Sequence, residues 1–323
     1  MNLVKNLNQK TLVKSALNYA IYILLLFFCL ILTFTTDAFL TFNNIVNVFL
    51  QTSIIGILAI GVSFVLITGN NDISMGAVMA VSSAAGVGLI KLQGWPWWAG
   101  MIVIVLVAVV FGALNGWIIA YVKVPAFLAT LSTQYIARGL SLVLSGGSSW
   151  FDLPKPFTFL ASSKVLNIPL IIIIMFVFYV VFHVRLRKTI FGRRIYAVGS
   201  SKDAARVSGI NVNKTILFAY IQCGLLVGCA TILQTARMNS FWASMGTGLE
   251  FQAIAASIIG GASMSGGVGR LTGTLAGVLL IGVINNALNL YGVDANWQEA
   301  VRGFVILMAV LLDAVRSRYN AAK

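Results

Sequence analysis

Two carboxylates, Asp72 and Glu250, interrupt long apolar segments in a chain of 323 residues that has only eight acidic side chains. A carboxylate within an apolar segment is costly to bury, so each is a candidate for binding a polar or charged solute. Asp72 follows Asn70 and Asn71 and precedes Ser74, which gathers side-chain oxygens at one turn. The turn predicts either direct contact with a solute or capping of the next helix by Asp72 or Ser74.

Glu250 also has a structural interpretation, because it follows Thr247 by three residues, the spacing of a capping box. Capping is therefore predicted as its first role, with solute binding as the alternative. Two other charges have expected partners nearby. Arg302 lies three residues after Glu299 and is predicted to pair with it on one helix face. Arg138 lies within an apolar segment and is predicted to pair with a carbonyl or an acid of a neighbouring helix.

A polar stripe crosses the apolar segment at 271–291. Asn285, Asn286 and Asn289 are spaced by three and four residues, so they lie near one face of a helix. The stripe predicts either hydrogen bonds between helices or the wall of a hydrophilic pathway, and the sequence leaves both open. Asn285 and Asn286 join the turn at 70–74 and Glu250 as candidate residues of a pathway or a helix break.

The residue patterns of enzymes are missing from this sequence. It has no G-x-x-x-x-G-K-[ST] phosphate loop, and the glycine-rich GGASMSGGVGR at 260–270 lacks the lysine of such a loop. His183 is the only histidine, and no nucleophile–base pair or pair of catalytic carboxylates can be assembled. We therefore predict a protein that is not an enzyme and that binds no cofactor or metal of its own.

The most polar part of the chain lies between two apolar segments, at 184–214. It reads VRLRKTIFGRRIYAVGSSKDAARVSGINVNK and holds eight basic residues against the single acid Asp203. A basic loop between apolar segments stays on the cytoplasmic side of a membrane. The segment is therefore predicted to be a cytoplasmic loop.

A short helix is predicted within this loop, at 200–209. Ser200 is expected to cap its N-terminus with Asp203 at the third helical position, and Gly209 is expected to end it. Isolated helices of two turns are marginal in water. The helix is therefore predicted to rest against another protein, the alternative being a solvated loop that only sets the topology.

Composition decides the solvent in which these elements fold. The chain is 59% hydrophobic and 9% charged, with a mean hydropathy of +0.94, whereas soluble domains have about 25% charged residues. The solvent is therefore lipid. The net charge of +14 does not indicate nucleic-acid binding, because the basic residues lie on short loops and form no single face.

The fold class that follows is an all-α, polytopic membrane protein in which residues 1–323 form a single transmembrane domain. A helix needs about 20 apolar residues to cross the bilayer. About ten spans are predicted, at 19–35, 45–68, 73–91, 98–122, 126–145, 166–183, 215–236, 250–265, 271–291 and 299–315. The distribution of Lys and Arg places both termini in the cytoplasm. Residues 1–18 are predicted either to lie as a helix in the cytoplasmic interface or to form a solvated tail.

Two helix–turn–helix units rich in glycine give the chain a weak internal echo. They read LAIGVSFVLITGNNDISMGAVMAV, near 58–81, and AIAASIIGGASMSGGVGRLTGTLAGVLLI, at 253–281. Repeats in the two halves of a transporter are often inverted in the membrane, so the echo indicates a five-plus-five inverted repeat. Small residues in both units allow helices to approach closely, or the backbone to break at membrane depth where it lines a cavity.

Long strings in the chain resemble a known family. They are FGRRIYAVGSSKDAARVSGINV at 191–212, TGLEFQAIAASIIGGASMSGGVGRLTGTLAGVLLIGVINNALNLYGV at 247–293 and TFNNIVNVFLQTSIIGILAIGVSFVLITGNNDISMGA at 41–77. The chain resembles, over nearly its whole length, the membrane permease subunits of bacterial ATP-binding-cassette sugar importers of the ribose, xylose and autoinducer-2 type. It departs from them at Asn70 and Asn71, where the family usually has Gly and Ile.

The resemblance implies a function and a set of partners. A permease of this kind sits in the bacterial cytoplasmic (inner) membrane and pairs with a second permease chain, identical or related. A periplasmic or extracellular binding protein delivers the sugar, and a separate cytoplasmic ATPase binds ATP and Mg. The segment 191–212 is then the element that couples to the ATPase. Its expected coupling residues are Gly192, Arg193, Arg194, Gly199, Ser200, Asp203, Ala204, Ala205, Arg206 and Gly209.

One further class of transporter is compatible with the residues. An ion-coupled secondary transporter would use Asp72 or Glu250 as its proton or sodium site and would need no ATPase. The small number of carboxylates in apolar segments speaks against this alternative, and it gives the basic loop no role.

Overall fold

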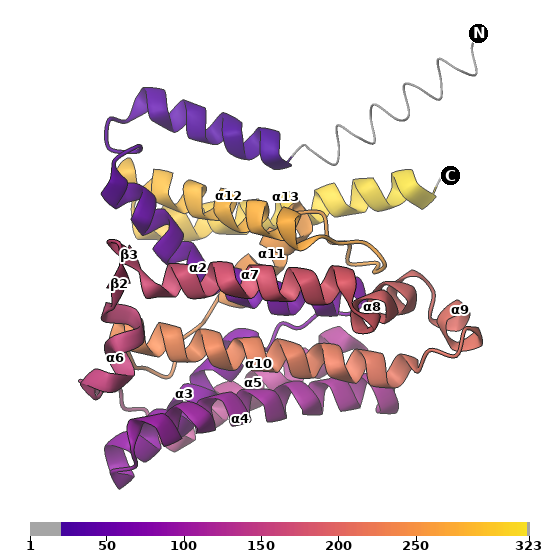
Figure 1. Cartoon of the computed structure of the whole chain (residues 1–323), viewed down its shortest axis with the longest axis horizontal. Helices are drawn as coiled ribbons and strands as arrows, with labels where there is room; N and C mark the ends of the chain where they lie inside the picture. The colour runs from indigo at the N-terminus through magenta and orange to yellow at the C-terminus, as the bar shows by residue number, and fades with distance from the viewer. Residues whose placement is uncertain (1–20, 322–323) are drawn as a thin grey trace.

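The computed structural model describes residues 21–321, nearly all of them in helices or short turns (Figure 1). An apolar helix at Ile21–Thr35 comes first. The helices that follow are α2 (Phe42–Ile67), α3 (Met75–Gln93), α4 (Trp97–Trp117) with a π-helical extension (Ile118–Val122), α5 (Ala126–Ser145), α6 (Lys155–Ser162), α7 (Leu170–Lys188), α8 (Ile190–Ser200), α9 (Lys202–Val207), α10 (Val212–Met238), α11 (Leu249–Ile259), α12 (Leu271–Leu290) and α13 (Ala295–Ala321). Two antiparallel strand pairs are β1 (Trp150–Phe151) with β4 (Ser240–Phe241), and β2 (Lys164–Val165) with β3 (Ile168–Pro169).

Among the described residues, six helices are long and apolar enough to cross a membrane: α2, α3, α4 with its extension, α7, α10 and α12. The all-α, polytopic class predicted from the sequence is confirmed. The other predicted spans also contain helices, but the helix at Ile21–Thr35 and α11 are short, and α5 and α13 carry more polar and charged side chains. The predicted count of ten spans therefore stays a prediction.

Two predicted boundaries are wrong. The predicted span at 250–265 ends as a helix at Ile259, because Gly260 and Gly261 follow, and Gly261 has the left-handed φ of +97° that a glycine tolerates best. The predicted cytoplasmic loop at 184–214 is mostly helical. α7 continues through its last basic residue, Lys188, and α8 and α9 occupy most of the remainder. Basic side chains in the last turn of α7 are favourable because they face the negative end of the helix dipole.

α2 lies at the centre of the bundle, since 89% of its most apolar stretch is buried. α4 and α7 are peripheral, with only 33% of their own apolar stretches buried, so one face of each remains for lipid. α4 packs closely on α10 because Gly112 and Gly224 face each other. A Cβ atom on Gly112 would lie 2.5 Å from the carbonyl oxygen of Tyr220. Small residues at such contacts let membrane helices approach closely.

The bundle has two distinct ends (Figure 1). α13 finishes at the end where α8 and α9 lie, on the right of the view. The strand pair β2–β3 and α6 lie at the opposite end. The prediction for residues 1–18 falls outside the described part of the chain. The end of α13 thus shares one end of the bundle with α8 and α9 (Figure 1).

Candidate functional site

The turn between α2 and α3 is buried and held by its own polar side chains. Asp72 is 4% exposed, and its Oδ1 accepts hydrogen bonds from the N–H of Ser74 at 2.9 Å and from the Ser74 hydroxyl at 2.6 Å. The predicted capping of α3 is wrong: its N-cap residue is Ser74, no side chain accepts from the first N–H groups of the helix, and Asp72 instead holds Ser74 just before it. Asn70 binds back to Thr68, and the Asn71 carbonyl accepts from the Tyr220 hydroxyl at 2.6 Å. The polar atoms identified in the sequence thus hold the turn.

A chain of hydrogen bonds continues from this turn into α4 and α5. Asn115 of α4 donates to the Ser74 hydroxyl at 3.0 Å, and Thr133 of α5 donates to Oδ1 of Asn115 at 2.6 Å. All of these side chains are buried. Asn115 and Thr133 were not among the residues expected from the sequence, although an asparagine among the apolar residues of α4 was a usable signal. The network fixes the turn relative to two helices far from it in sequence.

Burial also affects the protonation of Asp72, which lies in the loop between the two spans. Removal from solvent raises its pKa to about 6, and the two hydrogen bonds from Ser74 offset part of that increase. Lys123, in the loop after the extension of α4, has a lowered pKa. Burial contributes most to this shift, followed by the nearby positive charges of Arg206 and Lys202.

Glu250 is 1% exposed and lies in the first turn of α11. The predicted capping box is wrong. Gly248 is the N-cap residue, with a left-handed φ of +82°, and the Thr247 hydroxyl donates to the Ser244 carbonyl. The side chain that approaches Glu250 comes from α5, where Nε2 of Gln134 lies 3.5 Å from Oε1. Glu250 is therefore approached by α5 and also accepts backbone hydrogen bonds at its own helix start, from Gly248 and Glu250.

The structure brings the two carboxylate regions together through a pair of glycines. Gly76, four residues after Asp72, has no room for a side chain, because a Cβ atom there would overlap Oε2 of Glu250 and the carbonyl oxygen of Gly246. The segment at 242–248 is anchored by Arg138 of α5, which donates to the carbonyls of Ala243 at 2.7 Å and Met245 at 3.0 Å. The predicted pairing of Arg138 with a carbonyl is confirmed.

The asparagine stripe of α12 divides between two environments. Asn286 is 4% exposed and exchanges two hydrogen bonds with Asn44 of α2, at 3.1 and 2.7 Å, which is the interhelical bonding considered from the sequence. Asn289 accepts from Gln298 at 3.0 Å. Asn285 turns to another face, where its Nδ2 lies 3.5 Å from Oε1 of Gln252.

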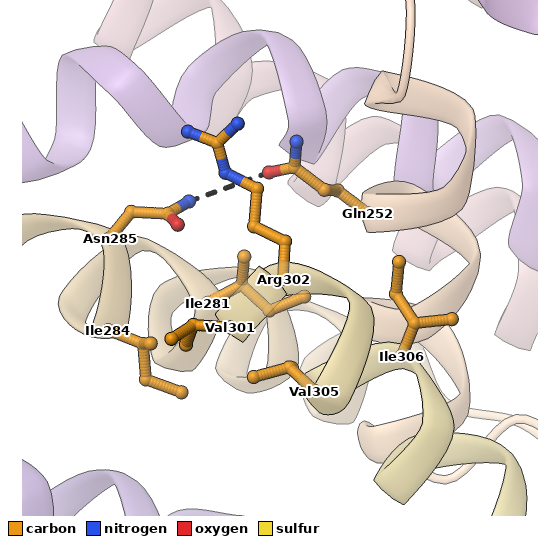
Figure 2. A pocket seen from close by; sticks show the side chains of 8 residues that line it. All are labelled: Gln252, Ile281, Ile284, Asn285, Val301, Arg302, Val305 and Ile306. Carbon is orange, nitrogen blue, oxygen red and sulfur yellow. Dashed lines mark hydrogen bonds between the residues drawn. The ribbon is translucent and has the colours of Figure 1, made fainter. Parts of the chain in front are cut away.

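Asn285 and Gln252 share a small pocket with Arg302 at the junction of α11, α12 and α13 (Figure 2). Its volume of about 10 Å³ has room for about one water molecule. Nε of Arg302 is buried and lacks a hydrogen-bond partner among the described residues, whereas Nη1 forms the predicted ion pair with Glu299 at 2.8 Å. Apolar side chains complete the wall: Ile281, Ile284, Val301, Val305 and Ile306. In this conformation the pocket is too small for a sugar.

The basic segment folds into two short helices at one end of the bundle. The cap of α9 is Ser201, whose hydroxyl accepts from the Ala204 N–H at 3.2 Å, so the prediction of Ser200 as the cap was one residue too early. Ser200 is instead the last residue of α8. Asp203 consequently lies at the second helical position of α9, where it pairs with Arg206 at 2.9 Å.

α9 ends where the sequence predicts. Gly209 has a left-handed φ of +77°, and the N–H of Ile210 bonds to the carbonyl of Ala205. Ala205 is buried against the bundle, while Val207 is 91% exposed. The remaining predicted coupling residues lie on α8 and α9. Gly192 is buried against the Leu186 carbonyl, Gly199 is half-buried, and the others are exposed: Arg193, Arg194, Ala204 and Arg206.

A bundle of apolar helices with buried polar turns and helical breaks has the features of a membrane transport component. Comparison with known proteins agrees. Residues 44–310 match the family model described as the permease component of branched-chain amino acid transport systems. The chain belongs to this family of transport permeases.

Named relatives cover most of the chain. It is 40% identical over 298 residues to the ribose import permease of Bacillus subtilis (strain 168), which covers 89% of this chain and 90% of that protein. It is 38% identical over 288 residues to the ribose import permease of Escherichia coli (strain K12), covering 85% and 87%. The D-allose transport system permease of the same strain is 36% identical over 282 residues, covering 87% and 86%. No solved structure matches the chain.

Proposed function

We propose that this chain is the permease subunit of an ATP-driven importer that moves a sugar across the bacterial cytoplasmic membrane. A second permease chain completes the pathway, and an extracytoplasmic binding protein delivers the sugar. ATP and Mg bind to a separate cytoplasmic ATPase, and the permease itself is a transporter subunit without a cofactor. The observation that carries the proposal is the extent of the match to the ribose, D-allose and xylose permeases, which reaches 98% of this chain for one xylose relative.

A sugar is favoured over an amino acid, although the family description names branched-chain amino acids. The relatives that match over most of this chain are named for ribose, D-allose and xylose. We infer that the binding protein makes most of the choice among sugars, and the pocket between α11, α12 and α13, with a volume of about 10 Å³, would not hold one. Because the family description names branched-chain amino acids, an uptake experiment includes leucine and valine as controls.

The proposed topology has ten membrane segments, with both termini and the basic segment in the cytoplasm. The position of the end of α13 beside the end that holds α8 and α9 supports a cytoplasmic C-terminus on the side of the basic segment (Figure 1). The proposed contact with the ATPase is α9, because its outer face is open. Val207 and Lys202 are exposed there, and Asp203 and Arg206 pair with each other.

The test is uptake into proteoliposomes that hold the permease and ATPase and receive the binding protein from outside. With ATP sealed inside and no proton or sodium gradient, we expect uptake of at least one of ribose, allose and xylose, and none of leucine or valine. Uptake that needs an ion gradient and ignores ATP would refute the proposal in favour of the secondary transporter. Replacing residues 202–208 by Gly and Ser should abolish co-purification of the ATPase, whereas the same treatment of the β2–β3 turn should not.

A further inference from the structure

The two glycine-rich turns that the sequence related only by composition meet at the end of α8. The first follows α2, at Gly69, and the second links α11 to α12, at Gly266 and Gly267. The N–H of Gly267 donates to the carbonyl of Ile67 at 2.9 Å. A Cβ atom on Gly266 would lie 2.8 Å from the backbone nitrogen of Gly69. The two turns therefore touch backbone to backbone, and no side chain fits between them.

The end of α8 packs against both turns where they meet. A Cβ atom on Gly199 would overlap the carbonyl oxygen of Ile67, and one on Gly266 would lie 2.8 Å from the carbonyl oxygen of Gly199. One turn earlier on α8, the Tyr196 hydroxyl donates to the carbonyl of Gly269 at 2.7 Å. We call the contact of Gly69, Gly199, Gly266 and Gly267 the glycine clasp.

The start of α8 is fixed to the same part of α2. Phe191 stacks on the buried Phe64, with ring centroids 6.3 Å apart and an interplanar angle of 16°. The guanidinium of Arg185 lies 5.0 Å from the centre of the Phe191 ring. α8 is therefore attached at both ends to the last turns of α2, and at its second end also to the loop before α12.

These contacts place α8 between the exposed helix α9 and both breaks in the bundle. Gly69 lies three residues before the buried Asp72. Gly266 and Gly267 lie in the loop that follows α11, the helix with Glu250 in its first turn. Close-packed backbone has little freedom to absorb a displacement of α8, since packed protein interiors transmit strain. A side-chain contact has rotamers that can relax. The glycine clasp thus links α8, which leads into α9, directly to the backbone of both glycine turns.

We propose that Tyr196 and Gly199 are positioning residues that transmit movement of α8 and α9 to the Asp72 turn and to α11. The proposal rests on the proposed function, because it assumes that α9 receives its movement from an ATPase. It adds that coupling of ATP hydrolysis to transport requires both glycine turns to stay in contact with α8. Tyr196 holds the turn between α11 and α12 through its hydrogen bond to the Gly269 carbonyl.

The test uses the complete complex of permease, ATPase and binding protein in proteoliposomes and measures sugar taken up per ATP hydrolysed. Tyr196→Phe removes one hydroxyl, and Gly199→Ala separates the clasp. We expect both variants to bind the ATPase in wild-type amounts and to lose about fivefold or more in uptake per ATP, the lower end of measured couplings between sites. Because sugar uptake is divided by ATP hydrolysed, a smaller folded fraction of the complex lowers both quantities and leaves the ratio unchanged.

Matched controls exist in the chain. Gly139→Ala makes the same change on α5, where a new Cβ meets nothing within 4 Å, and Tyr135→Phe removes an exposed hydroxyl. Both should keep the wild-type ratio. If Gly199→Ala does not fold, Tyr196→Phe decides alone. Wild-type coupling in Tyr196→Phe would overturn the proposal, whereas absence of ATP-driven uptake in the wild-type complex would instead refute the proposed function.

Discussion

The reciprocal pair of Asn44 and Asn286 allows a scaffolding role to be separated from a pathway role by measurement. Both polar atoms of the Asn286 amide bind Asn44, and Asn286 is almost completely buried between α2 and α12. Hydrogen bonds between membrane helices contribute about 0.6 kcal/mol on average and up to about 1.7. Two such bonds predict a coupling free energy of about 1–3 kcal/mol between the two positions.

The two single substitutions are expected to differ. Asn44→Ala leaves both polar atoms of the buried Asn286 amide without a partner, which costs about 1–3 kcal/mol. Asn286→Ala costs less, because Nδ2 of the half-buried Asn44 keeps its bond to the Phe39 carbonyl at 2.9 Å. Once one partner is gone, removal of the other should have little further effect.

The assay is a double-mutant cycle on equilibrium unfolding in mixed detergent micelles, followed by tryptophan fluorescence, with Asn47→Ala on the exposed side of α2 as control. ATP-driven uptake of the folded variants is measured in parallel and should persist in the double variant. A coupling below about 0.3 kcal/mol, the limit at which substitutions simply add, would refute the reasoning from the two hydrogen bonds. Loss of uptake in a fully folded double variant would instead assign Asn286 to the pathway.

Two other predictions concern the turn and the helix contacts. Because the pKa of Asp72 is raised above its ordinary value of 3.8 to about 6, charging it opposes folding. The free energy of unfolding should fall by about 3 kcal/mol as the pH rises from 4 through 6. Asp72→Asn should remove this decrease in denaturation curves recorded against pH. Asp203→Asn, the same change at an exposed carboxylate, should leave it in place. Gly112→Ala forces a Cβ atom against the Tyr220 carbonyl and should cost about 1–3 kcal/mol of stability by the same unfolding assay, with Gly139→Ala neutral. Equal stability of the two glycine variants would contradict the close packing of α4 on α10.

The polar residues show how far a single sequence can be interpreted. Arg138 was correctly expected to bond to a carbonyl and Arg302 to pair with Glu299, because a buried polar group must find a partner and few acids are available. The caps were less certain. Ser200 was predicted as the N-cap of α9, which is Ser201 in the structure. Thr247 was predicted to form a capping box with Glu250, but its hydroxyl donates to the Ser244 carbonyl. A cap depends on one φ/ψ pair, which neighbouring residues of the same type do not reveal.

The sequence by itself determined the solvent and the class of the protein, because apolar runs of span length leave no alternative to a helical bundle in lipid. It also located the basic segment and the two glycine turns. Only the tertiary structure decided that these three segments meet, that Asn286 faces α2 while Asn285 faces a pocket, and that Asn115 and Thr133 belong to the Asp72 turn. The physical reason is that hydropathy and spacing report how a segment faces lipid or protein. Which glycine backbone lies against which depends on the packing of distant helices.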